Sequence, residues 1–397
     1  MNFISDRANN LEESATLKMA ALARELKAQG KDIIGLTLGE PDFNTPDFVK
    51  AAAKKAIDDN YSHYTPVPGL DEIREAIVAK FKKENGLEFN KNQIVVSTGA
   101  KHSIMNLMLS LVNPGDEVIL PAPYWVSYIE MVKFAQGKPV VINTSIETEF
   151  KITKEQLEDV ITKDTKAFLF SNPCNPSGAA YSKDELQGLV SVFEKYPNTV
   201  IISDEIYEYI NFSGKNISLA SFESIKDRVV TVNGVSKGFA MTGWRIGYIA
   251  APQEVAKACG KIQGQFTSGA NAVAQMAAVA ALEAGSEKVQ YMKDEFLKRR
   301  DLMVSLLKTI NGLKVNIPQG AFYLFPDVSN FYGKSFNGKT VSNSEDMCSY
   351  LIEEALVATT PGSAFGSPNC IRLSYATSDE LLKKAADRMK KALGNLS

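Results

Sequence analysis

The chain has 397 residues, of which 45% are apolar and 23% charged, and its formal net charge at pH 7 is −2. This profile is typical of a globular protein that is long enough for two or three domains. The charge balance argues against a nucleic-acid partner, which needs basic patches to replace counterions. The N-terminal residues lack the apolar core of a signal peptide. The uncharged segment 262–282 carries several amides and hydroxyls, and it predicts a buried Ala-rich helix rather than a membrane span.

Cysteine and histidine usage limits the redox and metal chemistry that we expect. The sequence has two histidines and four cysteines, which are Cys174, Cys259, Cys348 and Cys370. These residues have neither close pairing nor the spacing of metal ligands. We therefore expect a reducing, cytoplasmic setting and no protein-ligated metal.

The first quarter of the chain alternates helix and strand signals. Residues 14–29 predict a helix with Ser14 as its N-cap and a glycine after its end. Residues 33–38 predict a strand, and a proline at position 46 predicts the start of another helix. The loop 61–69 is rich in aromatic residues and prolines, which pack locally in most loops but are also common at binding sites.

A candidate anion site follows the predicted strand 93–97. The strand leads into Thr98-Gly-Ala-Lys101 and then into an apolar helix that continues to Leu111. The first turn of a helix presents free backbone N–H groups and the positive end of the helix dipole, which suit a phosphate. Neither a Walker nor a dinucleotide-binding glycine pattern is present.

Later strands also end in residues of chemical interest. Strand and helix signals alternate over residues 90–250, which predicts a mainly parallel sheet flanked by helices. In such sheets the strand ends gather along one edge, where ligands bind. Taken singly, each strand-end residue has an ordinary structural reading as a packed ring, a helix cap or a solvated lysine. The residues that follow predicted strands are Trp125, Asn175, Asp204 and Lys237.

Lys237 is the candidate nucleophile among them. It follows the β-branched strand 229–232, and Arg245 comes eight residues later. Partial burial and a neighbouring cation would both lower the pKa of its amine, which would make it usable for Schiff-base chemistry.

Seven motifs together resemble the class I aminotransferases of pyridoxal-phosphate fold type I, and most closely the bacterial aspartate aminotransferases. They occur in the family's order across nearly the whole chain. The motifs are Gly39-Glu-Pro-Asp, Pro123-Tyr-Trp-Val-Ser-Tyr128, Asn172-Pro-Cys-Asn-Pro-Ser-Gly178, Ser203-Asp-Glu-Ile-Tyr207, Ser236-Lys237, Met241-Thr-Gly-Trp-Arg-Ile-Gly-Tyr248 and Ile371-Arg-Leu-Ser-Tyr-Ala-Thr377. The resemblance implies an α/β fold, with a large domain around the mainly parallel sheet and a smaller α+β domain. It implies a large domain of residues 46–284 and a small domain of residues 1–45 and 285–397. Within residues 285–397 the sequence predicts a helix over 286–310, a strand pair at 313–316 and 321–325, helices near 344–355 and 378–393, and a polar, Gly-rich surface loop over 333–343.

The resemblance also implies pyridoxal 5′-phosphate as cofactor. Lys237 would bind it covalently and move a proton at the substrate's Cα, and Asp204 would pair with the pyridine nitrogen. Asn175 and Tyr207 would bind the phenolic oxygen, and Trp125 would stack on the ring. The remaining contacts would hold the phosphate, and in the family the tyrosine matching Tyr64 comes from the neighbouring subunit of a homodimer. These residues are Ser97, Gly99, Ala100, Lys101, Ser236, Arg245 and Tyr64.

For the substrate, the resemblance implies that Arg372 binds the α-carboxylate and that Gly39 lets the substrate approach the backbone. Trp125 and Asn175 would also contact the substrate. No arginine for a distal carboxylate is recognisable, and in the bacterial branch this role falls to the lysine matching Lys101, with Ser14 and Thr16 nearby. Phosphate neutralisation is an equally good reading of Lys101.

The activity expected from the resemblance is transfer of the α-amino group of aspartate or glutamate to a 2-oxo acid. An aminotransferase for alanine or aromatic amino acids shares every cofactor contact, and a pyridoxal-phosphate lyase has the same fold. A transcription regulator fits less well, because no DNA-binding segment precedes the aminotransferase-like part. Relatives that accept prephenate carry a lysine near position 12, so Glu12 argues against that substrate.

Overall fold

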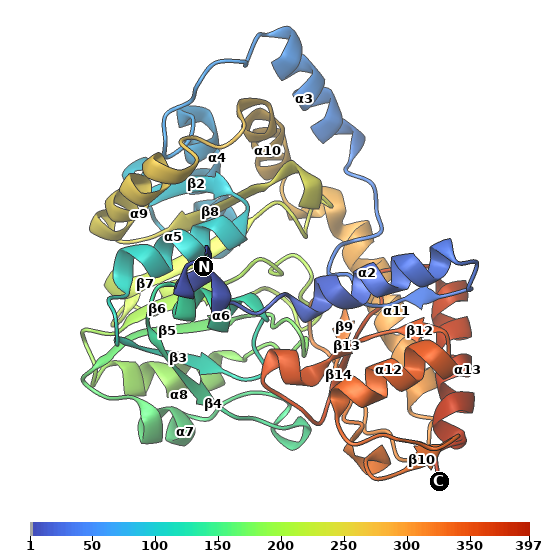
Figure 1. Ribbon diagram of the computed structural model, residues 1–397. Helices are drawn as coiled ribbons and strands as arrows, with labels where there is room; N and C mark the ends of the chain where they lie inside the picture. The colour runs from blue at the N-terminus through green and yellow to red at the C-terminus, as the bar shows by residue number, and fades with distance from the viewer. Residues whose placement is uncertain (1–2) are drawn as a thin grey trace.

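The computed structural model describes residues 3–397, so the first two residues of the predicted 1–45 segment lie outside it. Within this range the chain forms a central seven-stranded sheet with helices on both faces (Figure 1). Strand β8 pairs antiparallel with both of its neighbours, and the other pairs are parallel. The predicted mainly parallel α/β sheet is confirmed. In spatial order the strands are β2 (Ile94–Thr98), β8 (Ile246–Ala250), β7 (Val229–Gly234), β6 (Val200–Asp204), β5 (Thr165–Ser171), β3 (Glu117–Pro121) and β4 (Lys138–Ile142).

The strands are apolar on both sides because both faces of the sheet are covered. In β5, Ala167 and Leu169 belong to one hydrophobic core, whereas Phe168 and Phe170 belong to the other. This alternation explains why the strand reads as a continuous apolar run. One face packs against α5 (Ala100–Leu111), α6 (Ser127–Phe134) and α9 (Gln253–Phe266). The other packs against α4 (Asp71–Lys80), α8 (Lys183–Phe193) and α10 (Ala272–Ala284).

A second group of elements lies beside the sheet, at the right of Figure 1. It joins the two ends of the chain, because β1 (Ile34–Gly35) pairs in parallel with β12 (Val357–Ala358). Strand β14 (Ile371–Ser374) pairs antiparallel with β13 (Thr360–Pro361) and β9 (Tyr323–Leu324). The helices of this group are α2 (Ala15–Ala28), α11 (Gln290–Leu307), α12 (Ser344–Glu354) and α13 (Asp379–Gly394). The domain boundaries at residues 45 and 284 stay a prediction.

The predicted single helix over residues 262–282 is wrong. Helix α9 ends at Phe266 and α10 begins at Ala272. Between them Ser268 has a φ of 60°, and the side chain of Asn271 accepts a hydrogen bond from the backbone N–H of Ala274 at 2.8 Å. Because an asparagine that caps a helix starts a new one, it separates the two helices.

The short strands of the smaller part were also overestimated. Of the predicted strands 33–38 and 321–325 only Ile34–Gly35 and Tyr323–Leu324 form strands, and the predicted strand 313–316 is absent. There Lys314 makes an isolated bridge with Asp327, and the side chain of Asn316 accepts the backbone N–H of Phe325 at 2.9 Å. A side chain thus takes the place of a ladder partner.

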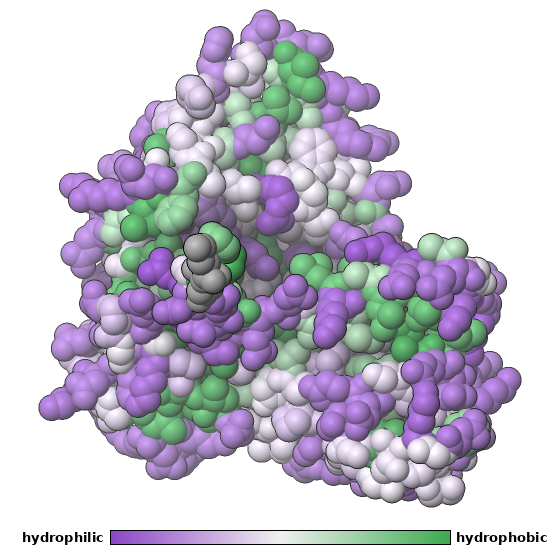
Figure 2. Space-filling view, in the orientation of Figure 1, coloured by the Kyte–Doolittle hydropathy of each residue, from purple (hydrophilic) through white to green (hydrophobic). Residues whose placement is uncertain are grey.

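Two further segments differ in detail. The predicted helix 286–310 begins with a 3₁₀ turn at Ser286–Val289 before α11, and the Gly-rich loop 333–343 contains a small hairpin of β10 (Ser335–Phe336) and β11 (Lys339–Thr340). Among residues 3–397 no helix combines the length and the apolarity that crossing a membrane requires. Figure 2 shows hydrophilic side chains over most of one face, with hydrophobic ones in separate patches.

Candidate active site

The strand ends of the sheet and the smaller part enclose a cavity of about 350 Å³, which we call the catalytic cavity. Eleven of the fourteen site residues predicted from the sequence line it, so the structure brings together groups that are up to 333 positions apart, from Gly39 to Arg372. They are Gly39, Ala100, Lys101, Trp125, Asn175, Asp204, Tyr207, Ser236, Lys237, Arg245 and Arg372. Ser14 and Thr16, which the sequence suggested for a distal carboxylate, also line it.

Lys237 lies in the turn that follows β7. Its Nζ atom donates a hydrogen bond to the backbone oxygen of Gly39 at 2.5 Å. Burial lowers the pKa of Lys237 to about 8, against the attraction of Glu40, and the cations Arg372 and Arg245 lower it further. The side chain is therefore an amine that loses its proton near pH 8 instead of near pH 10.5, which favours its use as a nucleophile and proton carrier.

Asp204 ends β6 and is 4% exposed. The phenol of Tyr128 donates a hydrogen bond to its carboxylate at 2.6 Å, and the backbone N–H of Ile206 donates another at 3.2 Å. Burial raises the pKa of Asp204 to about 6, although these two hydrogen bonds and the charge of Lys237 lower it. A buried carboxylate with a raised pKa is poised for a cationic partner.

Arg372 on β14 is 1% exposed and carries the only fully buried guanidinium group among the largest buried side chains of the described residues. Its Nη1 atom donates to Oδ1 of Asn175 at 2.9 Å, and its Nη2 atom donates to the backbone oxygen of Thr37 at 2.6 Å. Its Nε atom has no hydrogen-bond partner within residues 3–397. Since a buried donor without a partner is costly, this group is suited to bind an anion.

Tyr207 and Tyr323 form a second buried pair beside Lys237. Their hydroxyl groups lie 2.8 Å apart, and burial raises the pKa of both. The hydroxyl of Tyr323 lies where a side chain at Gly39 would begin, 2.6 Å from the position of a Cβ atom. A side chain at position 39 would therefore require Tyr323 to move, whether or not a substrate also approaches it there.

The turn 98–101 forms a candidate phosphate cradle. Gly99 is the N-cap of α5 with a φ of 85°, and a Cβ atom at this position would lie 2.5 Å from Nη2 of Arg245. The glycine thus lets a guanidinium group lie directly over the start of the helix. The backbone N–H groups of Ala100 and Lys101 belong to the first helical turn, where such groups lack intrahelical partners. Cation and N–H groups together suit a dianion.

Lys101 and Trp125 lie against each other at one side of the cavity. The Lys101 Nζ atom is 5.0 Å from the centre of the Trp125 ring, and the ring of Trp125 packs edge-on against Tyr128. Burial, followed by repulsion from Arg245, lowers the pKa of Lys101. No hydrogen bond from Nζ of Lys101 to a described residue is present, so the ammonium is available to a ligand.

Three predicted site residues do not line the catalytic cavity. Gly99 lies beneath Arg245, and the buried hydroxyl of Ser97 has no hydrogen-bond partner within residues 3–397. Tyr64 is 99% exposed and lies outside the cavity. Among the lining residues that were not predicted, Tyr128 and Tyr323 make buried hydrogen bonds to predicted site residues, Asp204 and Tyr207. Tyr128 was inside a motif that carried the resemblance, and its place on α6 one turn after Trp125 was the available signal, whereas nothing in the sequence distinguishes Tyr323 from a core residue.

Comparison with known proteins accounts for this arrangement. The family model described as aminotransferase class I and II matches residues 31–389. The chain belongs to the class I and II aminotransferases. An aspartate/prephenate aminotransferase from Cereibacter sphaeroides is 47% identical over 401 aligned residues, which cover 100% of both chains. An aspartate aminotransferase from Pinus pinaster is 46% identical, with 98% of this chain and 80% of that protein covered.

Solved aminotransferase structures agree with the fold described above. The aspartate aminotransferase from Rhizobium meliloti superposes with a TM-score of 0.96 at 42% identity and covers 100% of both chains. The aspartate aminotransferase from Thermus thermophilus with maleate gives a TM-score of 0.93 at 39% identity, covering 99% of this chain and 100% of that one. The resemblance seen in the sequence and the fold class are confirmed. Within residues 3–397 no cluster of three or more His, Cys, Asp or Glu side chains is arranged to hold a metal ion.

Proposed function

We propose that this aminotransferase transfers the α-amino group of aspartate or glutamate to 2-oxoglutarate or oxaloacetate with pyridoxal 5′-phosphate as its cofactor. The observation that carries the proposal is the convergence of Lys237, Asp204 and Arg372 in one cavity of about 350 Å³. Relatives named aspartate aminotransferase support the amino donor. The Thermus thermophilus structure was obtained with maleate, which is a dicarboxylate.

The residues present fit this cofactor group by group. Lys237 offers an amine to the aldehyde, and the buried carboxylate of Asp204 offers an ion pair to a protonated pyridine nitrogen. The Ala100 and Lys101 N–H groups with Ser236 and Arg245 offer donors to the phosphate. Trp125 offers a ring face, and Asn175 and Tyr207 offer donors to the phenolic oxygen. When bound, pyridoxal phosphate accepts the electron pair left on the substrate's Cα, which is why its nitrogen must stay protonated.

The chain's own residues then perform three tasks. Arg372 binds the α-carboxylate through its guanidinium group, whose Nε atom has no partner within residues 3–397, and this contact orients the Cα–H bond. Lys237 takes a proton from Cα and returns one, which suits an amine whose pKa is about 8. Asp204 keeps its negative charge because the cofactor nitrogen offsets the cost of burial.

Lys101 is the proposed contact for the distal carboxylate. Arg245 already supplies a cation over the phosphate cradle, and the Lys101 ammonium rests on Trp125 in a cavity that Ser14 and Thr16 also line. A point-charge ammonium tolerates side chains of different length better than a bidentate guanidinium does, so aspartate and glutamate both fit.

We further propose a cytoplasmic homodimer in which Tyr64 reaches the phosphate of the partner subunit. The support is its exposure of 99%, because a large aromatic side chain so exposed in one chain is a candidate for an interface. Tyr64→Phe should weaken cofactor retention by about 1–3 kcal/mol, the cost of one hydrogen bond to a charged acceptor. Mixing Tyr64 and Lys237 variants should restore activity, and its absence after confirmed subunit exchange would contradict the shared site.

A panel of amino donors tests the activity. We expect aspartate and glutamate to convert the cofactor's visible absorbance rapidly to that of its amine form within single turnovers, and alanine and phenylalanine to do so only slowly. Rapid conversion by alanine or aromatic donors would instead identify those aminotransferase activities. Release of pyruvate and ammonia without a 2-oxo acid would identify a lyase. Prephenate belongs in the acceptor panel, because relatives are named for it while Glu12 disfavours it.

A further inference from the structure

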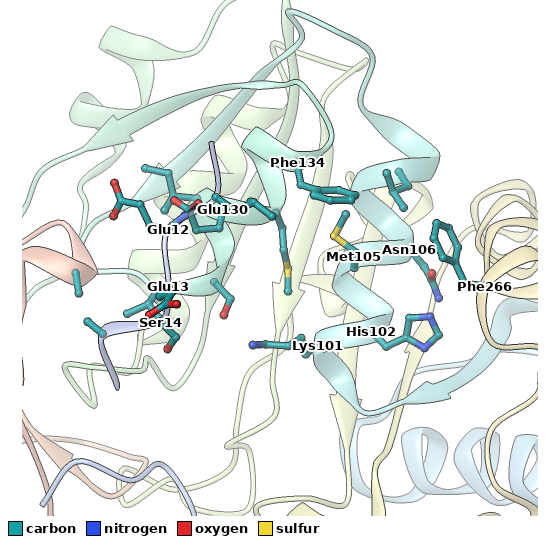
Figure 3. Close-up of a pocket in the computed structure, with 18 of the residues that line it drawn as sticks. Glu12, Glu13, Ser14, Lys101, His102, Met105, Asn106, Glu130, Phe134 and Phe266 are labelled. Atoms are coloured by element: carbon teal, nitrogen blue, oxygen red, sulfur yellow. Dashed lines mark hydrogen bonds between the residues drawn. The ribbon is translucent and has the colours of Figure 1, made fainter. Parts of the chain in front are cut away.

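His102 is a polar residue beside the proposed site that has no role so far. It is the third residue of α5, next to Lys101, and it lines a neighbouring cavity of about 590 Å³ rather than the catalytic cavity. Figure 3 shows the Lys101 ammonium and the His102 ring pointing to opposite sides of the first turn of α5. The ring is therefore placed to act on the backbone of the turn and not on a substrate.

The ring binds the end of the sheet's outermost strand. Nδ1 of His102 accepts a hydrogen bond from the backbone N–H of Thr98 at 3.2 Å. Strand β2 lies at the edge of the seven-stranded sheet, so its outward N–H groups have no neighbouring strand to bind. The N–H of Val96, two residues earlier, binds the carbonyl of Pro68 at 3.0 Å in the same outward direction. His102 thus satisfies an edge donor that would otherwise lack a partner.

This contact closes the candidate phosphate cradle. The backbone N–H of His102 donates to the oxygen of Gly99 at 3.0 Å, so residue 102 binds both residues that enter the turn. The ring bond adds a side-chain link between the end of β2 and the first turn of α5 to the backbone bonds that His102 and Ser103 donate to Gly99. These links set the angle between β2 and α5. That angle sets the direction of the Ala100 and Lys101 N–H groups.

We propose that His102 is a positioning residue for the phosphate cradle, acting through a neutral Nδ1 atom that accepts the Thr98 N–H. The inference rests on the proposed cofactor site and adds to it a residue that does not touch the cofactor. Its consequence is a loss of phosphate affinity in acid. A protonated imidazole carries hydrogen on both nitrogens, so it cannot accept the bond and it opposes the Thr98 donor.

The surroundings keep the ring neutral at neutral pH. Burial lowers the pKa of His102, so the bond persists there and is lost only as the pH falls through this lowered value. The charged groups that line the same cavity are Lys101 on α5, Glu12 and Glu13 on the N-terminal segment and Glu130 on α6, and Arg245 lies at the turn near Gly99. Figure 3 shows Glu12, Glu13 and Glu130 on the opposite side of the pocket from His102, so burial, and not a neighbouring charge, gives the direction of the pKa shift.

Two substitutions separate the role of Nδ1 as a hydrogen-bond acceptor from the effect of protonating the His102 ring. In His102→Asn the Oδ1 atom is attached to Cγ as Nδ1 is, so the acceptor stays and no longer titrates. In His102→Phe a ring of similar size stays and the acceptor is lost. The probe is pyridoxamine phosphate, which binds the full-length apoenzyme without a covalent bond to Lys237. Its affinity is measured by calorimetry from about pH 8 to about pH 5.

At about pH 8 we expect equal affinity for wild type and His102→Asn, and about 3- to 10-fold weaker binding by His102→Phe, as for one lost hydrogen bond. Below the lowered pKa of the ring, wild type should fall toward the His102→Phe level, while His102→Asn loses only what ligand titration and the other groups cause. Identical pH dependence of wild type and His102→Asn would overturn the inference.

Stronger acid binding by wild type than by His102→Asn would overturn it too, because that sign means direct attraction of the phosphate by a cation. If His102→Phe fails to fold, the comparison of wild type with His102→Asn still decides. If no protein binds pyridoxamine phosphate at about pH 8, the proposed function itself is wrong and the inference falls with it.

Discussion

Two cavities adjoin in this molecule and share Ser14, Lys101, Val126 and Ser127, yet only the smaller one has the character of an active site. The larger, of about 590 Å³, has an apolar floor that includes Met105 and Phe134, and its carboxylates lie at the rim. The catalytic cavity, of about 350 Å³, holds buried groups of both signs, Asp204, Lys237 and Arg372. The volume of a cavity therefore does not identify the active site. Buried charged groups that lack part of their hydrogen-bond partners identify it, because a bound ligand can supply those partners.

The largest expected effect comes from removing the proposed nucleophile of the catalytic cavity. Lys237→Ala should abolish turnover, because the other lysine of residues 3–397 that lines the catalytic cavity, Lys101, rests on Trp125 and not beside Gly39. The visible cofactor absorbance of the lysine adduct should disappear while pyridoxal phosphate still binds through its phosphate. A borohydride-trapped adduct in the purified variant would contradict the assignment.

Asp204→Ala comes next and should raise the barrier by several kcal/mol, since a neutral pyridine ring accepts the substrate's electron pair poorly. Asp204→Glu should keep part of the activity. Single-turnover rates with aspartate measure both. Near wild-type rates for Asp204→Ala would mean that the carboxylate only caps the end of β6.

The buried carboxylate of Asp204 should lower the free energy of unfolding of the protein when no cofactor is bound. Because burial raises the pKa of Asp204 from 3.8 to about 6, the folded apoprotein binds a proton more tightly than the unfolded chain does. Its stability should fall as the pH rises from about 4 to about 6, by roughly 3 kcal/mol at most. Asp204→Asn should therefore unfold at a higher temperature than wild type above about pH 6 and lose this advantage below about pH 4. An equal melting temperature at about pH 7.5 would contradict the desolvation cost.

The sequence predicted the catalytic cavity better than it predicted the parts that surround it. Strand ends and motifs identified the groups on the large sheet, because each follows a long apolar strand whose end has a fixed place in an α/β fold. The two-residue strands of the smaller part were overestimated, since side chains such as Asn316 replace ladder bonds there. The break before α10 was missed because Asn271 reads as one more amide in an uncharged run. Tyr323 was missed because only tertiary contact with Tyr207 separates it from a core residue.

Lys101 lines both cavities, and Lys101→Ala should have a smaller effect on activity than the changes at Lys237 and Asp204. It should lower kcat/KM for aspartate and glutamate by about 10- to 100-fold, the loss of one partly buried ion pair. Alanine as a slow donor should change little, and it is the matched control. An equal loss for both kinds of donor, with weaker cofactor binding, would assign Lys101 to the phosphate.

The smallest effect is expected from Glu130→Gln, which changes the rim of the larger cavity alone. The Glu130 carboxylate accepts the backbone N–H of Glu12 at 3.0 Å and the Lys133 ammonium at 2.8 Å. Glutamine keeps an acceptor for Glu12, so the N-terminal segment should stay in place while one negative charge is removed. Because the Glu130 side chain is 18% exposed and paired with Lys133, screening should limit the change in kcat/KM for aspartate to less than about 3-fold, in the upward direction.

Steady-state kinetics at low and high salt measure this difference, and added salt should remove it. The result decides whether the charge of Glu130 in the larger cavity influences the binding of aspartate. A fall of tenfold or more that affects aspartate but spares alanine would mean that Glu130 sets the position of Ser14 or Lys101 through the segment at Glu12. The two cavities would then act as one site, and the contrast between them would fail.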